Sequence, residues 1–261
     1  MGRVITICNQ KGGVGKTTTA INLSTYLAYA GQNVLLIDID PQANATSGLG
    51  FEKEKVGQSI YQTLVGDLEL KSAVRDTVVP NLSLIPSHPD LAGAEVELIY
   101  LEKREFRLRE KLRNLLSEYD LVFIDCPPSL SLLTVNAIVA CDSVLIPLQC
   151  EYYALEGLSQ LLKTIGLIKK RFNLQIEIEG ILLTMSDART SLSEQVIRDV
   201  REHMGDRVFR QEIPRSVRLS EAPSFGRPVL LHDSRSRGAL AYKDLASEFL
   251  SRRLELSTKL F

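Results

Sequence analysis

A short run of glycines and lysines joins the first apolar segment of the chain, residues 4–8, to the helical pattern that follows. It reads Lys11-Gly12-Gly13-Val14-Gly15-Lys16-Thr17-Thr18. Glycines let the backbone turn its N–H groups inward, and a helix presents the positive end of its dipole to the same point. The run therefore predicts a phosphate-binding loop between a strand and a helix, with Lys16 as a point charge and Thr17 as a Mg²⁺ ligand.

The front of this loop departs from the usual pattern GxxxxGK[ST]. That pattern has a glycine where this chain has Gln10, and a second lysine, Lys11, follows directly. A lysine in this place is not expected to bind the nucleotide of its own subunit by the usual route. Lys11 therefore requires a separate explanation.

Short β-branched runs alternate with longer amphipathic stretches along the whole chain. The runs expected as strands are residues 4–8, 34–38, 82–86, 121–125, 143–148, 178–184 and 208–213. Helical patterns fill most of the gaps, and the stretches 95–118 and 155–171 are expected to be helices that cover the sheet. This alternation predicts an α/β fold with a mostly parallel twisted sheet, helices on both faces and ligands at the carboxyl ends of the strands.

The chain has 261 residues, is 44% hydrophobic and contains neither an internal repeat nor a dividing linker, so we expect a single domain, 1–261. No apolar run approaches the roughly 18 residues that a membrane span needs. The first strand begins within a few residues of Met1, which leaves no room for a signal peptide. These features favour a soluble, cytoplasmic protein.

The cysteines show no metal-binding or redox spacing. We expect Cys8, Cys126, Cys141 and Cys150 to be reduced thiols in or beside strands. Charge is uneven along the chain, because residues 189–253 hold 13 basic side chains, 12 of them arginine, against 9 acidic ones, whereas the whole chain has a net charge of −1. Arginine is well suited to phosphate contacts, so this part of the chain favours a nucleic-acid partner.

Carboxylates stand at the ends of two further strands. Asp38 and Asp40 are two residues apart at one strand end, and Asp125 ends the apolar run 121–125. Beside a triphosphate, such carboxylates hold Mg²⁺ through its waters or orient an attacking water. Together with the phosphate-binding loop they predict a nucleoside triphosphatase.

Five segments of the chain resemble the ParA family of DNA-partitioning ATPases, and most closely its short chromosomal, Soj-like branch. They are KGGVGKTT, LLIDIDPQANATSGLG, FIDCPPSLSLLTVNA, LLTMSDART and IPRSVRLSEAPSFGRPV. The match runs from residue 3 to about residue 250. The resemblance implies a deviant Walker A ATPase that forms a homodimer around two ATP molecules, binds double-stranded DNA without sequence preference, and is released when a ParB-type partner stimulates hydrolysis.

The same resemblance implies roles for single residues. Lys11 matches the signature lysine that reaches into the partner subunit's site, and Lys16 matches the lysine that acts within its own subunit. Asp40 matches the residue needed for hydrolysis, while Asp38 and Asp125 match the carboxylates beside the metal. The residues that match the adenine contacts are Met185, Pro214, Arg215 and Ser216, and those that match the DNA contacts are Arg189 and Arg218.

Two departures from the family pattern are visible. Ser216 stands where the family usually has asparagine, and Ala43 stands where it usually has glycine. Ser216 keeps a hydroxyl that can form a hydrogen bond to the base, but this bond differs from the one that an asparagine would make. The expected preference for ATP over GTP therefore follows from the family resemblance and not from a residue of this chain.

Three other proteins on the same fold remain alternatives. A membrane-cycling ATPase of the MinD kind needs a basic amphipathic C-terminal helix, whereas the stripe Leu245, Phe249, Leu256 and Leu260 is expected on a helix that packs on the core. An iron–sulfur carrier needs cysteines placed to share a cluster. A ligase of the cobyrinic-acid type needs a pocket for a carboxylate substrate.

Overall fold

One central sheet organises the protein. The computed structural model describes the backbone of residues 2–172 and 175–258 and the side chains of these residues as far as Leu254. Within them the strand order is β3-β4-β2-β5-β1-β6-β7-β8, and all neighbouring pairs are parallel except β3 with β4. The strands are β1 (Arg3–Ile7), β2 (Val34–Asp38), β3 (Arg75–Asp76), β4 (Leu82–Ile85), β5 (Leu121–Asp125), β6 (Ser143–Gln149), β7 (Glu177–Ser186) and β8 (Ile213–Pro214).

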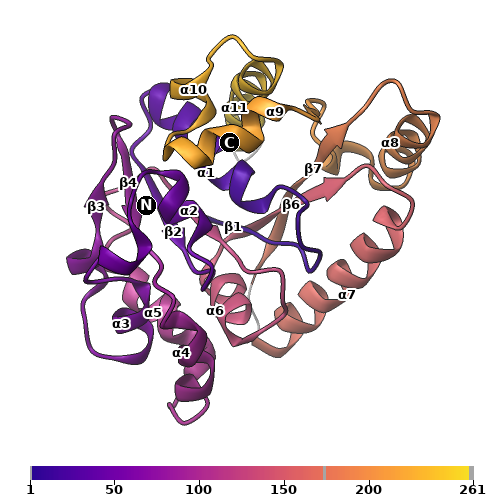
Figure 1. Ribbon diagram of the computed structural model, residues 1–261. Helices are drawn as coiled ribbons and strands as arrows, with labels where there is room; N and C mark the ends of the chain where they lie inside the picture. The colour runs from indigo at the N-terminus through magenta and orange to yellow at the C-terminus, as the bar shows by residue number, and fades with distance from the viewer. Residues whose placement is uncertain (1, 173–174, 259–261) are drawn as a thin grey trace.

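Helices cover both faces of this sheet (Figure 1). They are α1 (Lys16–Tyr29), α2 (Asn44–Gly48), α3 (Ile60–Val65), α4 (Leu91–Leu98), α5 (Arg107–Leu112), α6 (Leu132–Ala140), α7 (Ala154–Phe172), α8 (Ser191–Met204), α9 (Val217–Glu221), α10 (Val229–His232) and α11 (Arg237–Thr258). Short 3₁₀ turns are η1 (Lys53–Lys55), η2 (Leu70–Ala73), η3 (Arg104–Phe106), η4 (Gly205–Arg207) and η5 (Ala222–Phe225). The expected α/β fold, a mostly parallel sheet with helices on both faces, is confirmed.

Side chains at alternate positions of the strands pack into two separate hydrophobic cores. On β1, Ile5 and Ile7 belong to the core that α1 and α11 cover, whereas Val4 belongs to the core that α3 to α7 cover. Successive side chains of a strand point to opposite faces, so strands buried on both sides must be apolar throughout. All five residues of β2 and of β5 are buried, and each strand is apolar up to the aspartate that ends it.

The parallel arrangement brings distant parts of the chain to one edge of the sheet. β1 lies between β5 and β6, and β5 lies between β1 and β2. The register places Asp125 beside both Ile7 and Asp38, so three strand ends meet there. The loop after β1 therefore lies next to the two carboxylates, as expected for ligands at the carboxyl ends of the strands.

The strand expected at 208–213 is wrong. Val208 forms only an isolated bridge to β7, and the chain then leaves the sheet. It does so because the backbone N–H groups of Arg210 and Gln211 donate to the Glu248 carboxylate on α11, at 2.8 and 2.9 Å, instead of to a neighbouring strand. Only the two residues of β8 return to the sheet.

The single helix expected at 95–118 is also wrong. The segment is divided among α4, η3 and α5, and Lys103 between them has a positive φ of 51°, which a right-handed helix cannot accommodate. The antiparallel edge strand β3 was not expected, because two residues are too few to show a period. The helix expected at 155–171 is confirmed by α7, and the other expected strands are confirmed within two residues at each end.

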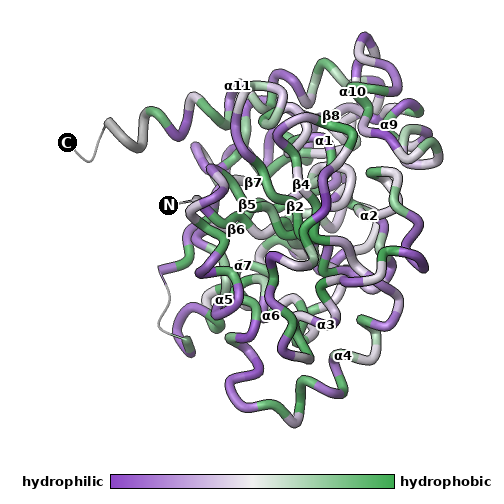
Figure 2. Tube along the Cα trace, turned by 90° about the vertical axis from the view of Figure 1, so that its left-hand side faces the viewer, coloured by the Kyte–Doolittle hydropathy of each residue, from purple (hydrophilic) through white to green (hydrophobic). Residues whose placement is uncertain are grey.

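The C-terminal helix α11 packs along α1 as expected. Leu245 and Phe249 are buried in the core shared with α1, while Leu256 and Leu260 lie outside the side chains that the structure describes. Figure 2 shows α11 crossing the upper part of the molecule. Among the described residues, none of the helices has the length and apolar character that crossing a bilayer would require.

The four cysteines are free thiols, as expected from their spacing. Cys8, Cys126 and Cys141 are buried, and Cys150 is partly buried. Burial raises the pKa of the Cys8 and Cys141 thiols to about 12, so they are not nucleophiles at neutral pH.

Candidate functional site

The loop between β1 and α1 is shaped to hold an anion. Gly13 and Gly15 have φ values of 73° and 91°, which favour glycine strongly. Gly15 is also the N-cap of α1, so no side chain caps the helix, and its first turn carries no acidic residue. The first N–H groups of α1 are thus available to a phosphate, with the helix dipole adding a favourable field.

Neighbouring strands hold this loop in place. The Thr184 hydroxyl on β7 donates to the Val14 carbonyl at 2.8 Å, and the Asn9 side-chain amide donates to the Pro147 carbonyl on β6 at 2.8 Å. Both side chains are buried. The conformation of the loop is therefore set by the sheet before any ligand binds.

Lys16 is buried at the start of α1, with 6% of its surface exposed. Its ammonium donates to the Lys11 carbonyl at 3.0 Å and forms no ion pair with a carboxylate among the described residues. Burial lowers the pKa of Lys16, and the nearby Asp125 carboxylate opposes this shift. A buried ammonium without a counter-ion is the arrangement that a phosphate group would complete.

Lys11, in contrast, is directed away from its own loop. Its ammonium forms an ion pair with Glu151, which lies in the turn between β6 and α7, and 53% of its side chain is exposed. The backbone N–H of Lys11 donates to the Asn9 side chain at 3.1 Å. The backbone of Lys11 is thus fixed within the loop while its charge sits at the surface.

The carboxylates at the ends of β2 and β5 differ in their partners. Asp38 accepts three hydrogen bonds, from the backbone of Asp40 at 3.1 Å and from the N–H and hydroxyl of Thr46 at 2.8 Å each. Both oxygens of Asp125 are buried and accept no hydrogen bond among the described residues. Burial raises the pKa of Asp38 to about 7, and burial together with the charge of Asp38 raises the pKa of Asp125 well above its ordinary value.

These groups fit a Mg²⁺ ion held beside phosphates. The two unpartnered oxygens of Asp125 are the observation that supports a missing cation, and the Thr17 hydroxyl lies close enough to lower the pKa of Asp125. The described residues contain no set of three or more His, Cys, Asp and Glu side chains suited to a metal. Mg²⁺ usually takes one or two protein ligands and completes its shell with phosphates and water, so Thr17 and Asp125 are sufficient.

A hydrogen-bond chain fixes the loop that carries Asp40. The Thr46 hydroxyl accepts a bond from the Ser87 N–H at 2.9 Å while donating to Asp38, and the Ser87 hydroxyl donates to the Asp40 carbonyl at 2.7 Å. The Asp40 carboxylate accepts from the Gln42 N–H at 2.9 Å and is 5% exposed. Asp40 therefore has a fixed position near the phosphate-binding loop.

The four residues expected to contact a base come together in one pocket of about 120 Å³. Met185 has a positive φ of 51° at a bulge where the register of β7 and β8 shifts, and Arg215 donates its N–H to the Ser186 carbonyl at 3.1 Å. The bulge turns the chain at the carboxyl end of β7. The pocket is lined by Met185, Pro214, Arg215 and Ser216, with Gly15 and Thr18 from the loop side.

The two arginines expected to bind DNA are exposed and paired with acids. Arg189 forms two hydrogen bonds with Asp187, at 2.9 and 2.7 Å, and 85% of its side chain is exposed. Arg218 pairs with Glu221 at 2.8 Å and with Asp233 at 3.3 Å. The Arg189 guanidinium holds the pKa of Asp187 well below its usual range, so this pair stays charged.

Three residues of the site were not singled out from the sequence. Thr46 and Ser87 position Asp38 and Asp40, and Glu151 holds Lys11. Ser87 and Glu151 both follow strands of the sheet at the carboxyl edge, which is the one signal that could have found them. Most of the residues that they contact are 41 or more positions away in the sequence, and only Asp38 and Thr46 are close, at eight positions apart.

Comparisons with known proteins agree with this geometry. A family model described as an AAA domain matches residues 2–178. The chain is 58% identical to the sporulation initiation inhibitor protein Soj of Bacillus subtilis, over 95% of this chain and 98% of that protein. It is 54% identical to the chromosome partitioning protein ParA of Myxococcus xanthus, over 97% of this chain and 89% of that protein.

A solved structure with a different name is also similar. It is the cobyrinic acid a,c-diamide synthase of Mycobacterium smegmatis with a bound ATP analogue and magnesium, which is 37% identical with a TM-score of 0.83. The similarity covers 95% of this chain and 93% of that one.

Proposed function

Since the chain belongs to the ParA and Soj family of chromosome-partitioning ATPases, which use ATP and Mg²⁺, we propose that it runs an ATP-driven DNA-partitioning cycle. Two subunits dimerise face to face around two ATP molecules, and the dimer binds double-stranded DNA without sequence preference. A ParB-type partner then stimulates hydrolysis, and the DNA is released. The cycle takes place in the cytoplasm, on the nucleoid.

The observation that carries this proposal is the position of Lys11. Its backbone belongs to the phosphate-binding loop, but its ammonium pairs with Glu151 at the surface and does not join Lys16. This charge takes no part in its own subunit's phosphate-binding loop, so once it leaves Glu151 it can be presented to the phosphates of a partner. A cation supplied in this way stabilises the transition state of phosphoryl transfer, as an arginine finger does.

Within one subunit the remaining groups divide the work. Lys16 and the first N–H groups of α1 would bind the phosphates, and Thr17 with Asp125 would hold Mg²⁺, whose charge would stabilise the phosphate oxygens. Asp38 already accepts three hydrogen bonds from protein groups, so it would add negative charge beside the Mg²⁺ site without binding the ion directly. Asp40 orients the attacking water.

DNA binding follows from the arginines on the surface. Arg189 and Arg218 are each held by carboxylates in the single chain, and DNA phosphates would replace those carboxylates. One subunit offers few contacts, whereas a dimer doubles them on one surface. Affinity for DNA then depends on the nucleotide that holds the dimer together.

DNA binding measured with ATP, with ADP and without nucleotide, across a salt series, tests the proposal. We expect binding with ATP alone, weakening as salt rises, and its loss in Arg189→Ala plus Arg218→Ala. Arg113→Ala, an exposed arginine that follows α5, is the matched control and should bind like the wild type. Unchanged binding in the double variant would show that the DNA surface is assigned wrongly.

A second experiment separates the two lysines. Lys11→Ala should bind ATP but fail to turn it over, whereas Lys16→Ala should lose ATP binding, because only Lys16 is buried beside its own loop. Asp40→Ala should bind ATP and remain a dimer. ATP binding by fluorescence and phosphate release measure these effects, and normal turnover by Lys11→Ala would remove its proposed role in the partner's site.

Two alternative functions would use the same nucleotide site, and experiments on the purified chain distinguish them from DNA partitioning. The cobyrinic-acid-type reaction is supported by the similar solved structure at 37% identity, against 58% for Soj. DNA binding that depends on ATP would not be expected of such a ligase. A MinD-like protein would sediment with liposomes in the presence of ATP, and we expect this chain to remain in the supernatant.

A further inference from the structure

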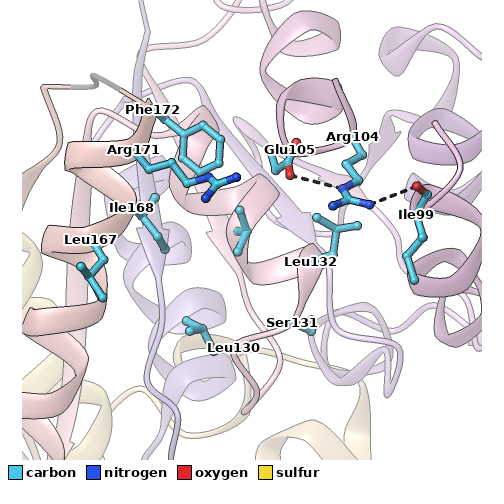
Figure 3. Close-up of a pocket in the computed structure, with 11 residues that line it drawn as sticks. Ile99, Arg104, Glu105, Leu130, Ser131, Leu132, Leu167, Ile168, Arg171 and Phe172 are labelled. Atoms are coloured by element: carbon cyan, nitrogen blue, oxygen red, sulfur yellow. Dashed lines mark hydrogen bonds and ion pairs between the residues drawn. The ribbon is translucent and has the colours of Figure 1, made fainter. Parts of the chain in front are cut away.

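A large apolar pocket lies apart from the nucleotide site, between η3, α6 and α7. Its volume is about 530 Å³, which is within the range of small-molecule sites. Figure 3 shows its walls, with Leu132 on one side and Leu167 and Ile168 on the other. The rim leaves Ile99, Leu130 and Leu167 exposed, each by more than 40%. Large apolar side chains gathered in this way mark a binding surface.

Two arginines lie at the edge of the pocket, and they differ in their partners among the described residues. Figure 3 shows Arg171 and Arg104 extending toward the pocket from opposite sides. Arg104 is already bound, since it pairs with Glu105 at 3.3 Å and donates to the Ile99 carbonyl at 3.1 Å. Arg171 lies 5.9 Å from the centre of the Phe172 ring and has no carboxylate partner among the described residues. Arg171 is exposed at the edge of the pocket, where its guanidinium can pair with an anionic group of a bound ligand.

The walls of the pocket are fixed without a ligand. Asn136 on α6 donates to the Arg104 carbonyl at 2.8 Å and accepts from the Leu108 N–H at 3.2 Å, which ties η3 and α5 to α6. The rings of Phe106 and Phe172 meet edge to face at 5.3 Å, which ties η3 to the end of α7. A pocket held in this way loses little entropy when it is filled.

We propose that this pocket binds a free medium-chain carboxylate, with its apolar chain against Leu132, Leu167 and Ile168 and its carboxylate on Arg171. The pocket has the volume for such a ligand, an apolar interior, and the Arg171 guanidinium at its edge. This combination of a mostly apolar lining and a single polar anchor is typical of sites for amphiphilic ligands.

The pocket also shares a segment with the nucleotide site. Residues 126–131 join Asp125 to α6, and Leu130 and Ser131 line the pocket. Pro128 in the same segment lies against the phosphate-binding loop, since a Cβ built on Gly12 would be 3.9 Å from its Cβ. A ligand in the pocket and a nucleotide in its site would therefore both contact or border the segment 126–131. We expect the affinity for the pocket ligand and the affinity for the nucleotide to be linked through this segment. This link rests on the proposed nucleotide site, whereas the pocket itself does not.

Calorimetric titration of the full chain with decanoate, without nucleotide, tests the pocket. Decanol lacks the charge and acetate lacks the chain, so both should bind at least about tenfold more weakly than decanoate. Arg171→Gln should weaken decanoate binding by about tenfold, while Lys170→Gln, an exposed neighbour outside the pocket, should change it less than twofold. Circular dichroism checks that both variants are folded.

The titrations have outcomes that would overturn the proposal. Equal binding of decanol and decanoate, or decanoate binding unchanged by Arg171→Gln, would overturn the proposal. Binding only to vesicles that contain anionic lipid, or only to an acidic apolar peptide, would also overturn it. Repeating the titration with ATP and Mg²⁺ tests the link, and equal affinities in both conditions would refute the link alone. The titration without nucleotide tests the pocket independently of the proposed partitioning function, so a failure of that function would leave the result for the pocket unchanged.

Discussion

The unpartnered carboxylate of Asp125 makes the stability of the nucleotide-free protein depend on pH. The nearby Thr17 hydroxyl and the Lys16 charge lower its pKa, but burial and the charge of Asp38 outweigh them and raise it well above the ordinary value. The folded chain therefore keeps a proton that the unfolded chain, with a pKa of about 3.9 for an exposed aspartate, releases. The free energy of unfolding must then fall as pH rises above that value.

Asp125→Asn removes this proton exchange. One proton held only by the folded state changes stability by about 1.4 kcal/mol per pH unit, so the variant should gain up to about 2.7 kcal/mol over the wild type between pH 5 and pH 7. Asp38, whose pKa is about 7, interacts electrostatically with Asp125, so the pH dependence that Asp125→Asn removes belongs to the pair of carboxyls. The gain in stability comes with the loss of a Mg²⁺ ligand.

Urea unfolding followed by circular dichroism at pH 5, 6 and 7, without Mg²⁺ or nucleotide, measures this difference. Asp67→Asn, an exposed carboxylate between α3 and η2, is the control and should show no such trend. Addition of ATP with Mg²⁺ should stabilise the wild type by mass action and the Asp125→Asn variant much less. A difference in stability that is the same at pH 5 and pH 7 would mean that Asp125 is already ionised in the fold, and the reasoning would fail.

Two further substitutions test other parts of the structure. Glu151→Gln should free Lys11 from a half-exposed ion pair worth up to about 1 kcal/mol in each subunit, so ATP-dependent dimers should form at about 3- to 30-fold lower protein concentration in sedimentation velocity; weaker dimerisation would contradict the holding role of Glu151. Gly226→Ala should cost about 1–3 kcal/mol of unfolding free energy, because φ is 61° and the new Cβ would lie 2.7 Å from the Gly50 Cα. Gly166→Ala, at an open helical position in α7, should instead stabilise by up to about 1 kcal/mol, and equal effects of the two alanines would refute this account.

Local chemistry explains which parts of the fold were predictable. The sequence predicts the buried strands β2 and β5 with their correct ends, because four apolar residues followed by an aspartate have few other interpretations. The segment 208–213 has apolar residues only at Val208, Phe209 and Ile213, and a carboxylate 38 residues away, Glu248, takes the backbone N–H groups of its polar middle. That competition is tertiary and leaves no local signal.

The site shows the same division. The glycine-rich loop and Asp125 are marked by residues adjacent in sequence, whereas Glu151 becomes part of the site only because β6 lies next to β1. The family resemblance indicated Met185, yet its positive φ at a strand bulge depends on the register between β7 and β8. Roles that depend on strand order and register could not be predicted from neighbouring residues alone.

The place of β1 in the sheet has a consequence for how the protein is made. β1 emerges first during synthesis, but its partners β5 and β6 begin at residues 121 and 143. More than a hundred further residues must therefore be synthesised before β1, the central strand with apolar side chains on both faces, can pair along either edge. Such a strand is prone to pair with other chains, and distant pairing is slow. We expect the nascent chain to depend on chaperones that shield exposed apolar segments until β5 has left the ribosome.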